Sequence, residues 1–573
     1  MNRFQKITLN MSRGIIFTVF AVICFYLFLL SIFTTCFMVY TDEHVFYLKD
    51  YAPLMCLGLI CLCILLTLIR KKRILEISHL KQAAVIGSVV LAAFLAFFVL
   101  FMKLKPIYDQ GMIYYSAGRL LSGDFTDWKK GAYYSMLSYQ NGMMLMMCPF
   151  VALFRENGYL AFQLFNIPVM LLTYLGVAKI SGIYFGKKSA YVTYLALLSV
   201  VPAWTYVTFV YGTWPSFCLA VWAIWLEIRF EQTEKWRYAV LCGVCMMFSI
   251  MWKSNSEIFL VAICIMLLLH AVRNKSWKMP LGMLIILFFS YLEIKGVPWI
   301  VHEITGENTS QGIPFIAWLA MGMQESSIAP GWYNEFPMNL YKKLGPNAKA
   351  ITAASLQSFA KSFALFDSQK EYMFRFFARK LASMWADPAF QCFTSVNTRN
   401  LKGTFPYLVK DIFYNGGIVN TILYLFFDVL QSIQYFGLVL FLVLRRKEHR
   451  LEYSHLIVGI LGGFLFHFIG EAKSQYVMPY YLLMVPFAVE GYRRMTDRLR
   501  YRWEMRREKG FLKPVLRTGT IRIGLVLGCL IVIFSFMKGP VMTSTIRLGG
   551  QERDYVWYCL HETEWKNADY FKR

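Results

Sequence analysis

Apolar and polar positions divide this chain into long uncharged runs and short basic clusters. Residues 15–40 and 85–102 contain no charged side chain, and residues 189–228 contain only Glu227. A helix needs about 20 apolar residues to cross the hydrocarbon of a bilayer. Such runs must be helical, because lipid offers no hydrogen-bond partner to an unpaired backbone amide. The pattern therefore predicts an all-α polytopic membrane protein.

The basic clusters predict the orientation of these helices. Lys and Arg gather at residues 70–73, 187–188, 445–447 and 493–522, between the apolar runs. Basic loops stay on the cytoplasmic side of a membrane, so we expect a cytoplasmic N-terminus and an extracytoplasmic C-terminus. About thirteen transmembrane helices follow, at residues 15–40, 51–69, 81–102, 159–185, 189–209, 215–228, 238–252, 258–269, 279–300, 418–444, 456–469, 477–489 and 523–536.

Two segments depart from the pattern of spans. The apolar segment 141–154 would be only about 20 Å long as a helix, so we interpret it as re-entrant or interfacial. The segment 301–416 is comparatively polar and predicts an extracytoplasmic loop domain. The predicted parts are an N-terminal hairpin (1–80), a core (81–300) with a first outer loop (103–140), the loop domain (301–416), C-terminal helices (417–538) and an extracytoplasmic tail (539–573).

Composition argues against a soluble domain and against a nucleic-acid-binding protein. Hydrophobic residues make up 57% of the chain and charged residues 16%, against about 25% charged in soluble domains. The net charge of +25 could indicate nucleic acid, but the basic residues lie between apolar runs rather than on a soluble face. Most of the 13 cysteines lie inside apolar runs, where they act as small apolar residues.

An acidic residue follows the third predicted helix directly. Asp109 lies just past residue 102, at the start of the first outer loop. A carboxylate there could act as a general base toward a hydroxyl group. The alternative is a cap for a following helix at residues 112–121.

Polar residues interrupt two apolar helices at residues 253–257. Lys253 and Asn255 stand there with two serines and Glu257. Such groups at a helix break could bind a phosphate or a sugar hydroxyl. A hydrated interfacial turn is the simpler interpretation.

Two further clusters fall on the same predicted outer side. Glu325, Trp332, Tyr333 and Asn334 combine aromatic rings with amide and carboxylate groups, which suits a sugar, although an interfacial aromatic belt would look alike. Glu471, Lys473 and Tyr476 lie between two late helices. Lys473 and Tyr476 could hold a phosphate oxyanion, or the segment could be a turn with a local ion pair.

These four clusters, in this order, resemble the GT-C glycosyltransferases. The likeness is nearest to bacterial relatives of protein O-mannosyltransferases and aminoarabinose transferases, and it covers residues 103–491. The predicted helices before residue 80 would be an N-terminal addition. The resemblance implies that Asp109 is the essential acid of the first outer loop. It also implies that Lys253, Lys473 and Tyr476 face the lipid phosphate. Two features depart from the family: no tight pair of acids stands in the first loop, and Gln475 takes the place of an Arg before the late Tyr.

The resemblance implies transfer of a sugar from a polyprenyl-phosphate carrier to an acceptor, by a single displacement that inverts the anomeric centre. Asn255, Glu325, Trp332, Tyr333, Asn334 and Glu471 would contact the substrates. The acceptor would be a glycan, a lipid or a protein. No metal site and no required cofactor are expected, although a divalent cation near Asp109 is compatible with the family. The expected location is a plasma membrane, of a bacterium by the resemblance, with no nucleic-acid partner.

Two other functions stay open. A flippase or transporter for a lipid-linked saccharide would need ionisable residues along a path at mid-membrane, where only Glu293, Asp428 and His467 stand out. The absence of an obvious internal repeat also weakens it. A polysaccharide polymerase or ligase would also use lipid-linked sugars. The early position of Asp109 in an outer loop favours the transferase.

Overall fold

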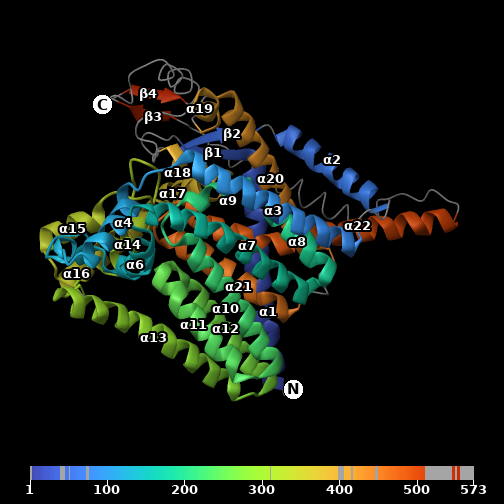
Figure 1. The fold of residues 1–573 in the computed structure, drawn as a ribbon. Helices are drawn as coiled ribbons and strands as arrows, with labels where there is room; N and C mark the ends of the chain where they lie inside the picture. The colour runs from blue at the N-terminus through green and yellow to red at the C-terminus, as the bar shows by residue number, and fades with distance from the viewer. Residues whose placement is uncertain are drawn as a thin grey trace.

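The computed structural model is a bundle of helices with a smaller group of helices at one end (Figure 1). The structure describes residues 3–38, 45–50, 52–71, 76–309, 311–397, 406–413, 417–444, 450–509, 545–548 and 551–554. Among these residues, seven helices are long and apolar enough to cross a membrane, or eight if one bent pair counts as a single span. The all-α polytopic architecture is confirmed, and the larger number of thirteen spans stays a prediction.

The N-terminal segment contains a hairpin of strands that hydropathy did not predict. Its elements are α1 (Arg3–Phe33), β1 (Thr34–Met38), β2 (Val45–Lys49), α2 (Ala52–Lys71) and α3 (Ile77–Met102). The first helix was expected to reach residue 40, and it ends at Phe33. β-Branched Thr34 and Thr35 favour a strand at this point. They pair with Lys49 and Leu48 of the antiparallel β2.

Helix α1 lies inside the bundle and is not a peripheral addition. Phe20 is fully buried, and its ring contacts Phe487 at 5.8 Å between centroids. The hydroxyl of Ser432 on α20 donates to the carbonyl of Ser31 at 2.8 Å. The interpretation of the first two helices as an N-terminal addition to the family region stays a prediction, but it did not foresee that α1 packs inside the bundle.

The central helices follow the predicted order with one break. The predicted span 189–209 is broken, because α8 and residues 201–208 meet at a bend of 69°. Pro202 in the first turn of α9 has no N–H to continue the ladder of α8. The helices are α4 (Tyr108–Leu121), α5 (Tyr133–Met136), α6 (Asn141–Phe154), α7 (Gly158–Phe185), α8 (Lys187–Leu198), α9 (Val201–Trp204), α10 (Thr213–Thr233), α11 (Trp236–Trp252), α12 (Glu257–Asn274) and α13 (Lys278–Thr305).

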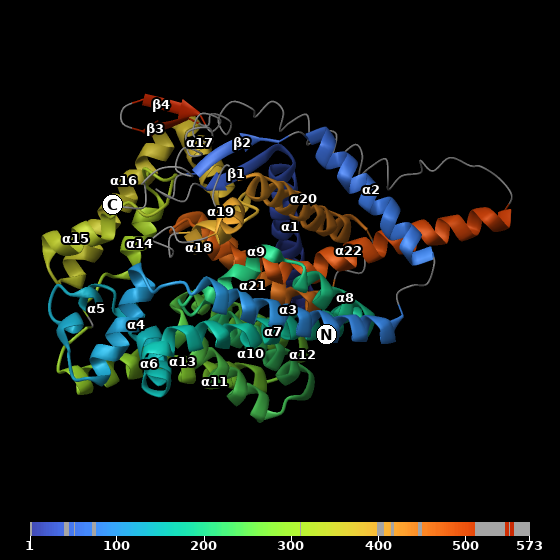
Figure 2. The same cartoon turned by 45° about the horizontal axis from the view of Figure 1, so that its top comes forward.

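The predicted loop domain is mainly helical and packs on the first outer loop. Its helices are α14 (Phe315–Gly322), α15 (Phe336–Leu344), α16 (Ala348–Ser368), α17 (Lys370–Trp385), α18 (Cys392–Asn397) and α19 (Tyr407–Phe413). We call α4, α5, α14, α15 and α16 the cap, and it lies at the left in both views (Figures 1 and 2). A small core of Leu137, Ile313 and Tyr341 joins the two parts. The amide of Ile313 donates to the carbonyl of Met136 at 2.9 Å.

The last described helix is longer than its apolar run. The elements are α20 (Ile418–Val443), α21 (Ser454–Ile469), α22 (Ser474–Lys509), β3 (Thr545–Leu548) and β4 (Gln551–Asp554). Helix α22 continues past the predicted end at residue 489 because charged side chains pair along it. Glu490 binds both Arg493 and Arg494, three and four residues later. The predicted span 523–536 lies outside the described residues.

Candidate active site

Asp109 stands in the first turn of α4, at the end of the bundle that the cap covers. The N-cap of this helix is Ile107, and no side chain caps it. The capping interpretation of Asp109 is therefore wrong. The neighbouring Gln110 is buried and anchors this turn, since its side-chain oxygen accepts from the Tyr159 hydroxyl and from the amide of Val210. Asp109 itself is exposed.

Two tyrosines orient the Asp109 carboxylate. The hydroxyl of Tyr133 donates to Oδ1 at 2.8 Å, and the hydroxyl of Tyr211 donates to Oδ2 at 3.1 Å. Burial, with the negative charge of Asp109 beside them, raises the pKa of both phenols well above its usual value. Both therefore remain neutral donors, and they hold an exposed carboxylate in one orientation.

A tight turn brings Tyr211 against the end of α11. Gly212 has a positive φ of 67°, which glycine adopts without strain. A Cβ at Gly212 would also collide with the carbonyl of Trp252. Only glycine allows the turn before α10 to approach Trp252 so closely, and Lys253 follows Trp252 directly.

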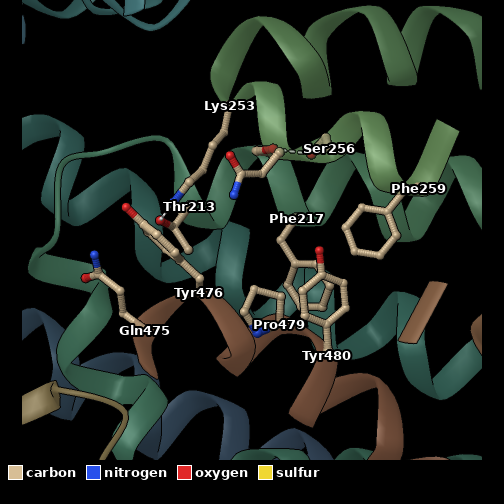
Figure 3. Close-up of a pocket in the computed structure, with 11 residues that line it drawn as sticks. Thr213, Phe217, Lys253, Ser256, Phe259, Gln475, Tyr476, Pro479 and Tyr480 are labelled. Atoms are coloured by element: carbon tan, nitrogen blue, oxygen red, sulfur yellow. Dashed lines mark hydrogen bonds between the residues drawn. The ribbon is translucent and has the colours of Figure 1, made fainter. Parts of the chain in front are cut away.

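Lys253 lies between α11 and α12, next to the same tyrosine. Its Nζ donates to the Thr213 hydroxyl at 3.2 Å. Figure 3 shows Lys253 beside Tyr476. Its Nζ lies 5.3 Å from the ring centroid of Tyr476 and 5.4 Å from that of Tyr211, within the range of a cation–π contact. Tyr211 thus contacts Asp109 with its hydroxyl and Lys253 with its ring. The candidate base and the candidate phosphate ligand belong to one site.

A pocket of about 390 Å³ opens beside Lys253 (Figure 3). Two of the other predicted ligands, Asn255 and Tyr476, line it. Aromatic and apolar side chains form the rest of one wall, so the pocket combines one cation with polar groups and rings. The remaining lining residues are Thr213, Ser216, Phe217, Ser256, Phe259, Gln475, Pro479 and Tyr480.

The charges around Lys253 come from the turn between α21 and α22. Burial and the charge of Lys473 lower the pKa of Lys253 from its usual value to about 8, while Glu471 acts in the opposite direction. The positive charges of the two lysines would attract an anion such as a phosphate. The structure therefore brings Lys253, Glu471, Lys473 and Tyr476 together from distant parts of the sequence.

A buried lysine of α17 supports this turn. The ammonium group of Lys380 donates to the carbonyls of Gly322, Ile469 and Gly470, at 2.5, 3.2 and 2.7 Å. A Cβ at Gly322 would collide with the backbone of Gly470, so the cap and the turn are in direct contact. Lys380 joins the end of α14 to the turn that carries Glu471 and Lys473.

The predicted cluster of Glu325, Trp332, Tyr333 and Asn334 contributes fewer side chains to the site than expected. Trp332 is buried, and its indole N–H donates to the Ser383 hydroxyl at 2.8 Å. Its ring packs in the interior and offers no face to a sugar, which corrects the prediction for this residue. Asn334 shapes its own loop, since it donates to the side chain of Gln324 and to the carbonyl of Glu325.

Tyr333 and Glu325 remain on the surface of this cluster. Tyr333 is 37% exposed. Burial, with the charges of Glu335, Asp109 and Glu471, raises the pKa of Tyr333. It therefore lies within electrostatic reach of Asp109. The exposed Glu325 accepts from the Tyr372 hydroxyl at 3.1 Å.

Three residues of the site were not predicted as functional. Tyr133, Tyr211 and Thr213 look in the sequence like ordinary loop and turn residues. The sequence hinted at a functional role only through the position of Tyr211 and Thr213, in a turn between two apolar runs.

Comparison with known families identifies the core that holds the pocket. Residues 142–293 match the model of the dolichyl-phosphate-mannose-protein mannosyltransferase family. These residues therefore resemble the core of a GT-C type membrane glycosyltransferase. The matched region includes Thr213, Lys253 and Asn255, and it excludes Asp109 and the turn at Glu471. The resemblance seen in the sequence is confirmed over these residues.

The other comparisons add little to this family match. No curated protein matches the chain. Among solved structures, one match is the archaeal oligosaccharyltransferase AglB from Archaeoglobus fulgidus, in complex with an inhibitory peptide and a dolichol-phosphate. The two share 11% identity with a TM-score of 0.39, over 86% of this chain and 59% of that chain. The chain therefore spans about three fifths of the length of that relative.

Proposed function

We propose that this protein transfers a sugar from a polyprenyl-phosphate carrier to an acceptor hydroxyl, at the extracytoplasmic face of a plasma membrane. The observation that carries the proposal is the joint contact of Tyr211 with Asp109 and Lys253. It places an oriented carboxylate and a half-buried cation in one site. The match of residues 142–293 to a family of lipid-phosphate mannosyltransferases supports the choice of donor.

The donor phosphate would bind at the pocket beside Lys253. Lys253, Lys473 and Tyr476 supply charge and a hydroxyl for the phosphate oxygens, and Asn255 stands at the same pocket. Lysine is a point charge without the fork of arginine, so two lysines would share the task that one arginine performs elsewhere. Their charge would stabilise the leaving phosphate in the transition state.

Asp109 would act as the general base. The acceptor oxygen attacks the anomeric carbon, the bond from that carbon to the phosphate oxygen breaks, and the hydroxyl proton passes to Asp109. The anomeric configuration inverts in this single displacement. Tyr133 and Tyr211 hold the carboxylate in place, and the exposed side of Asp109 is open to the acceptor. Proton transfer to a positioned base contributes about 10²–10⁴-fold to a rate.

The proposed chemistry needs no metal ion. Among the residues that the structure describes, one group of metal-ligating side chains converges, and Asp109 is not part of it. The acceptor would approach over the cap, where Tyr333 and Glu325 are exposed. The acceptor that binds at this exposed surface would be a glycan, a lipid or a protein.

The test compares sugar transfer by wild type, Asp109→Asn and Asp124→Asn in native membranes and in nanodiscs. Asp124 is an acid of the same loop that accepts from the amide of Thr126 at 3.1 Å, so it is a matched control. We expect Asp109→Asn to bind the lipid-phosphate donor normally and to lose at least about 100-fold in transfer rate. Asp124→Asn should transfer at the rate of the wild type.

The alternatives predict different outcomes. Transfer by Asp109→Asn at the wild-type rate would contradict the role of Asp109. Movement of labelled lipid-linked sugar across vesicles without transfer would favour a flippase. Extension of a glycan chain from diphosphate-linked oligosaccharides alone would favour a polymerase.

A further inference from the structure

A second cluster of ionisable groups lies at the far end of α10 from the candidate active site. Glu227 and Glu231 are one turn apart on α10 and share a face. Thr213 of the pocket is 14 residues before Glu227, or about 21 Å along the helix. His455 enters the same cluster from the first turn of α21, and α10, α12 and α21 lie side by side (Figures 1 and 2).

The side chains of this cluster converge on one point. His455 Nε2 lies 2.9 Å from Oε2 of Glu231 and 3.7 Å from Oε1 of Glu227. One ligand atom from each of the three residues lies within 4.8 Å of the others. All three side chains are buried, with exposed fractions of 1% for Glu227, 5% for Glu231 and 4% for His455. We call these three residues the Glu–Glu–His cluster.

The orientation of His455 directs a lone pair into the cluster. Its Nδ1 lies 2.9 Å from the carbonyl of Glu452. A carbonyl only accepts, so Nδ1 carries the hydrogen and the neutral ring has its lone pair on Nε2. That lone pair then faces two carboxylates. The 2.9 Å contact between Nε2 and Glu231 therefore needs a proton or a metal ion between the two atoms.

Three of the four carboxylate oxygens of the cluster also lack a hydrogen-bond partner, and the fourth, Oε2 of Glu231, contacts both histidines. Both oxygens of Glu227 and Oε1 of Glu231 are buried without a hydrogen-bond partner. An ionised carboxylate away from water is costly unless it is paired or binds a metal. Two basic residues near this end are paired elsewhere: Arg273 with Glu452 and Lys278 with Glu234. The cluster therefore places two buried carboxylates beside one imidazole.

We infer that the Glu–Glu–His cluster binds one divalent transition-metal ion, with zinc as the best match. Zinc takes carboxylate oxygen and imidazole nitrogen in tetrahedral sites at about 2.0–2.2 Å. Ligand atoms around such an ion lie about 3.4 Å apart, so small rotations of three side chains close the cluster. Magnesium and calcium prefer oxygen ligands throughout, and the imidazole of His455 disfavours both.

His270 on α12 forms the outer part of this site. Its Nδ1 lies 3.0 Å from Oε2 of Glu231, and its Nε2 accepts from the amide of Asn274 at 2.7 Å. This arrangement leaves the hydrogen on Nδ1, where it donates to Glu231. Metal-ligating carboxylates commonly have such a second partner that orients them. The site would join α10 and α21 directly and α12 through His270.

The proposed role is structural. The site is separated from Asp109 and Lys253 by most of the length of α10, so the ion does not touch the reacting groups. An ion that binds only the folded protein stabilises it in proportion to the logarithm of its concentration. The inference does not depend on the sugar-transfer proposal, and its failure would leave that proposal intact.

The test measures zinc binding by the purified full-length chain in nanodiscs after treatment with a chelator. We expect the wild type to bind one zinc ion per chain, measured by equilibrium dialysis and elemental analysis, and cobalt to give the visible absorption of a tetrahedral site. Zinc should raise the melting temperature of the chelator-treated wild type. This measurement needs no variant, so a folding defect cannot obscure it.

Variants then locate the ion. Glu227→Gln and His455→Gln should each weaken zinc binding by at least about 100-fold, and His270→Asn by about 10–100-fold. Glu234→Gln is the matched control, because Glu234 lies three residues after Glu231 and its carboxylate is bound to Lys278 and Ser276. Absence of stoichiometric zinc in the wild type would overturn the inference and would leave a pair of carboxylates sharing a proton. Equal zinc binding by Glu227→Gln and Glu234→Gln, or stoichiometric binding of magnesium alone, would also overturn it.

Discussion

Tyr211 shows how a single residue can join groups that no sequence pattern connects. Its hydroxyl orients Asp109 and its ring faces Lys253, and these two residues are far apart in the chain. The carboxylate and the ammonium group could be recognised as candidates from residue type and position alone. Their common neighbour could not, because a tyrosine in a turn between apolar helices is an ordinary interfacial residue.

The lowered pKa of Lys253 predicts how activity depends on pH. Burial lowers this pKa to about 8, against about 10.4 for a free lysine. Lys253 is charged below about pH 8 and neutral above it. We therefore expect kcat/KM for the lipid-phosphate donor to fall as the pH rises through about 8. The fall in kcat should come at higher pH, because bound phosphate stabilises the charge.

Lys253→Arg is the control for this pH profile. A guanidinium group stays charged over the whole range, so the variant should lose the fall near pH 8 whatever its absolute rate. An identical fall in both proteins would assign the titration to another group.

At the scale of the element, the turn between α21 and α22 depends on α17 for its position. The turn carries Glu471 and Lys473, yet its first carbonyls bind Lys380. The amide of Ala472 also donates to the carbonyl of Gly331 at 2.8 Å. The prediction that residues 471–476 form a polar turn agrees with the structure. The support from Lys380 was not predictable, because a lysine in an amphipathic helix is normally a solvated residue.

Lys380→Met tests this support. Methionine has a similar length and no donor, so three buried carbonyls lose their partner. We expect a loss of about 3 kcal/mol in the free energy of unfolding, measured as a lower melting temperature in detergent, and weaker donor binding. Lys361→Met is the control, since Lys361 is an exposed lysine of α16. Equal melting temperatures of the two variants would contradict the role of Lys380.

At the scale of the whole molecule, α1 completes the bundle rather than preceding it. Its buried face packs on α20 and α22, while Val22 on the opposite face is 65% exposed. A hydropathy pattern identifies a span but not its neighbours, because every face of a membrane helix is apolar whether it meets lipid or protein. The packing of α1 against α20 and α22 could for this reason not be predicted from the sequence.

Phe20→Ala tests whether α1 is part of the core. The substitution removes the contact with Phe487 and leaves a cavity, at a cost of about 3 kcal/mol. We expect a clear drop in melting temperature and less monodisperse protein on size exclusion. Val22→Ala should change neither, because its side chain faces outward. A stable Phe20→Ala variant would indicate that α1 is dispensable for folding.

The sequence by itself determined the class of the protein and most of its helices. Hydropathy is a local property: an uncharged run must be a helix in lipid whatever surrounds it. Breaks at Pro202 and at Thr34 are also local, and they were missed because apolar character masked the backbone preferences of proline and β-branched residues. The resemblance to GT-C enzymes likewise rested on short clusters along the chain, and the match of residues 142–293 bears it out.

The tertiary structure alone decided which of these groups meet. It joined Asp109 to Lys253 through Tyr211, buried Trp332, and brought Glu227, Glu231 and His455 together from two helices. Each of these facts depends on contacts between residues far apart in the chain. Such contacts are set by helix packing and by close approaches at glycines such as Gly212 and Gly322, which a one-dimensional pattern does not record.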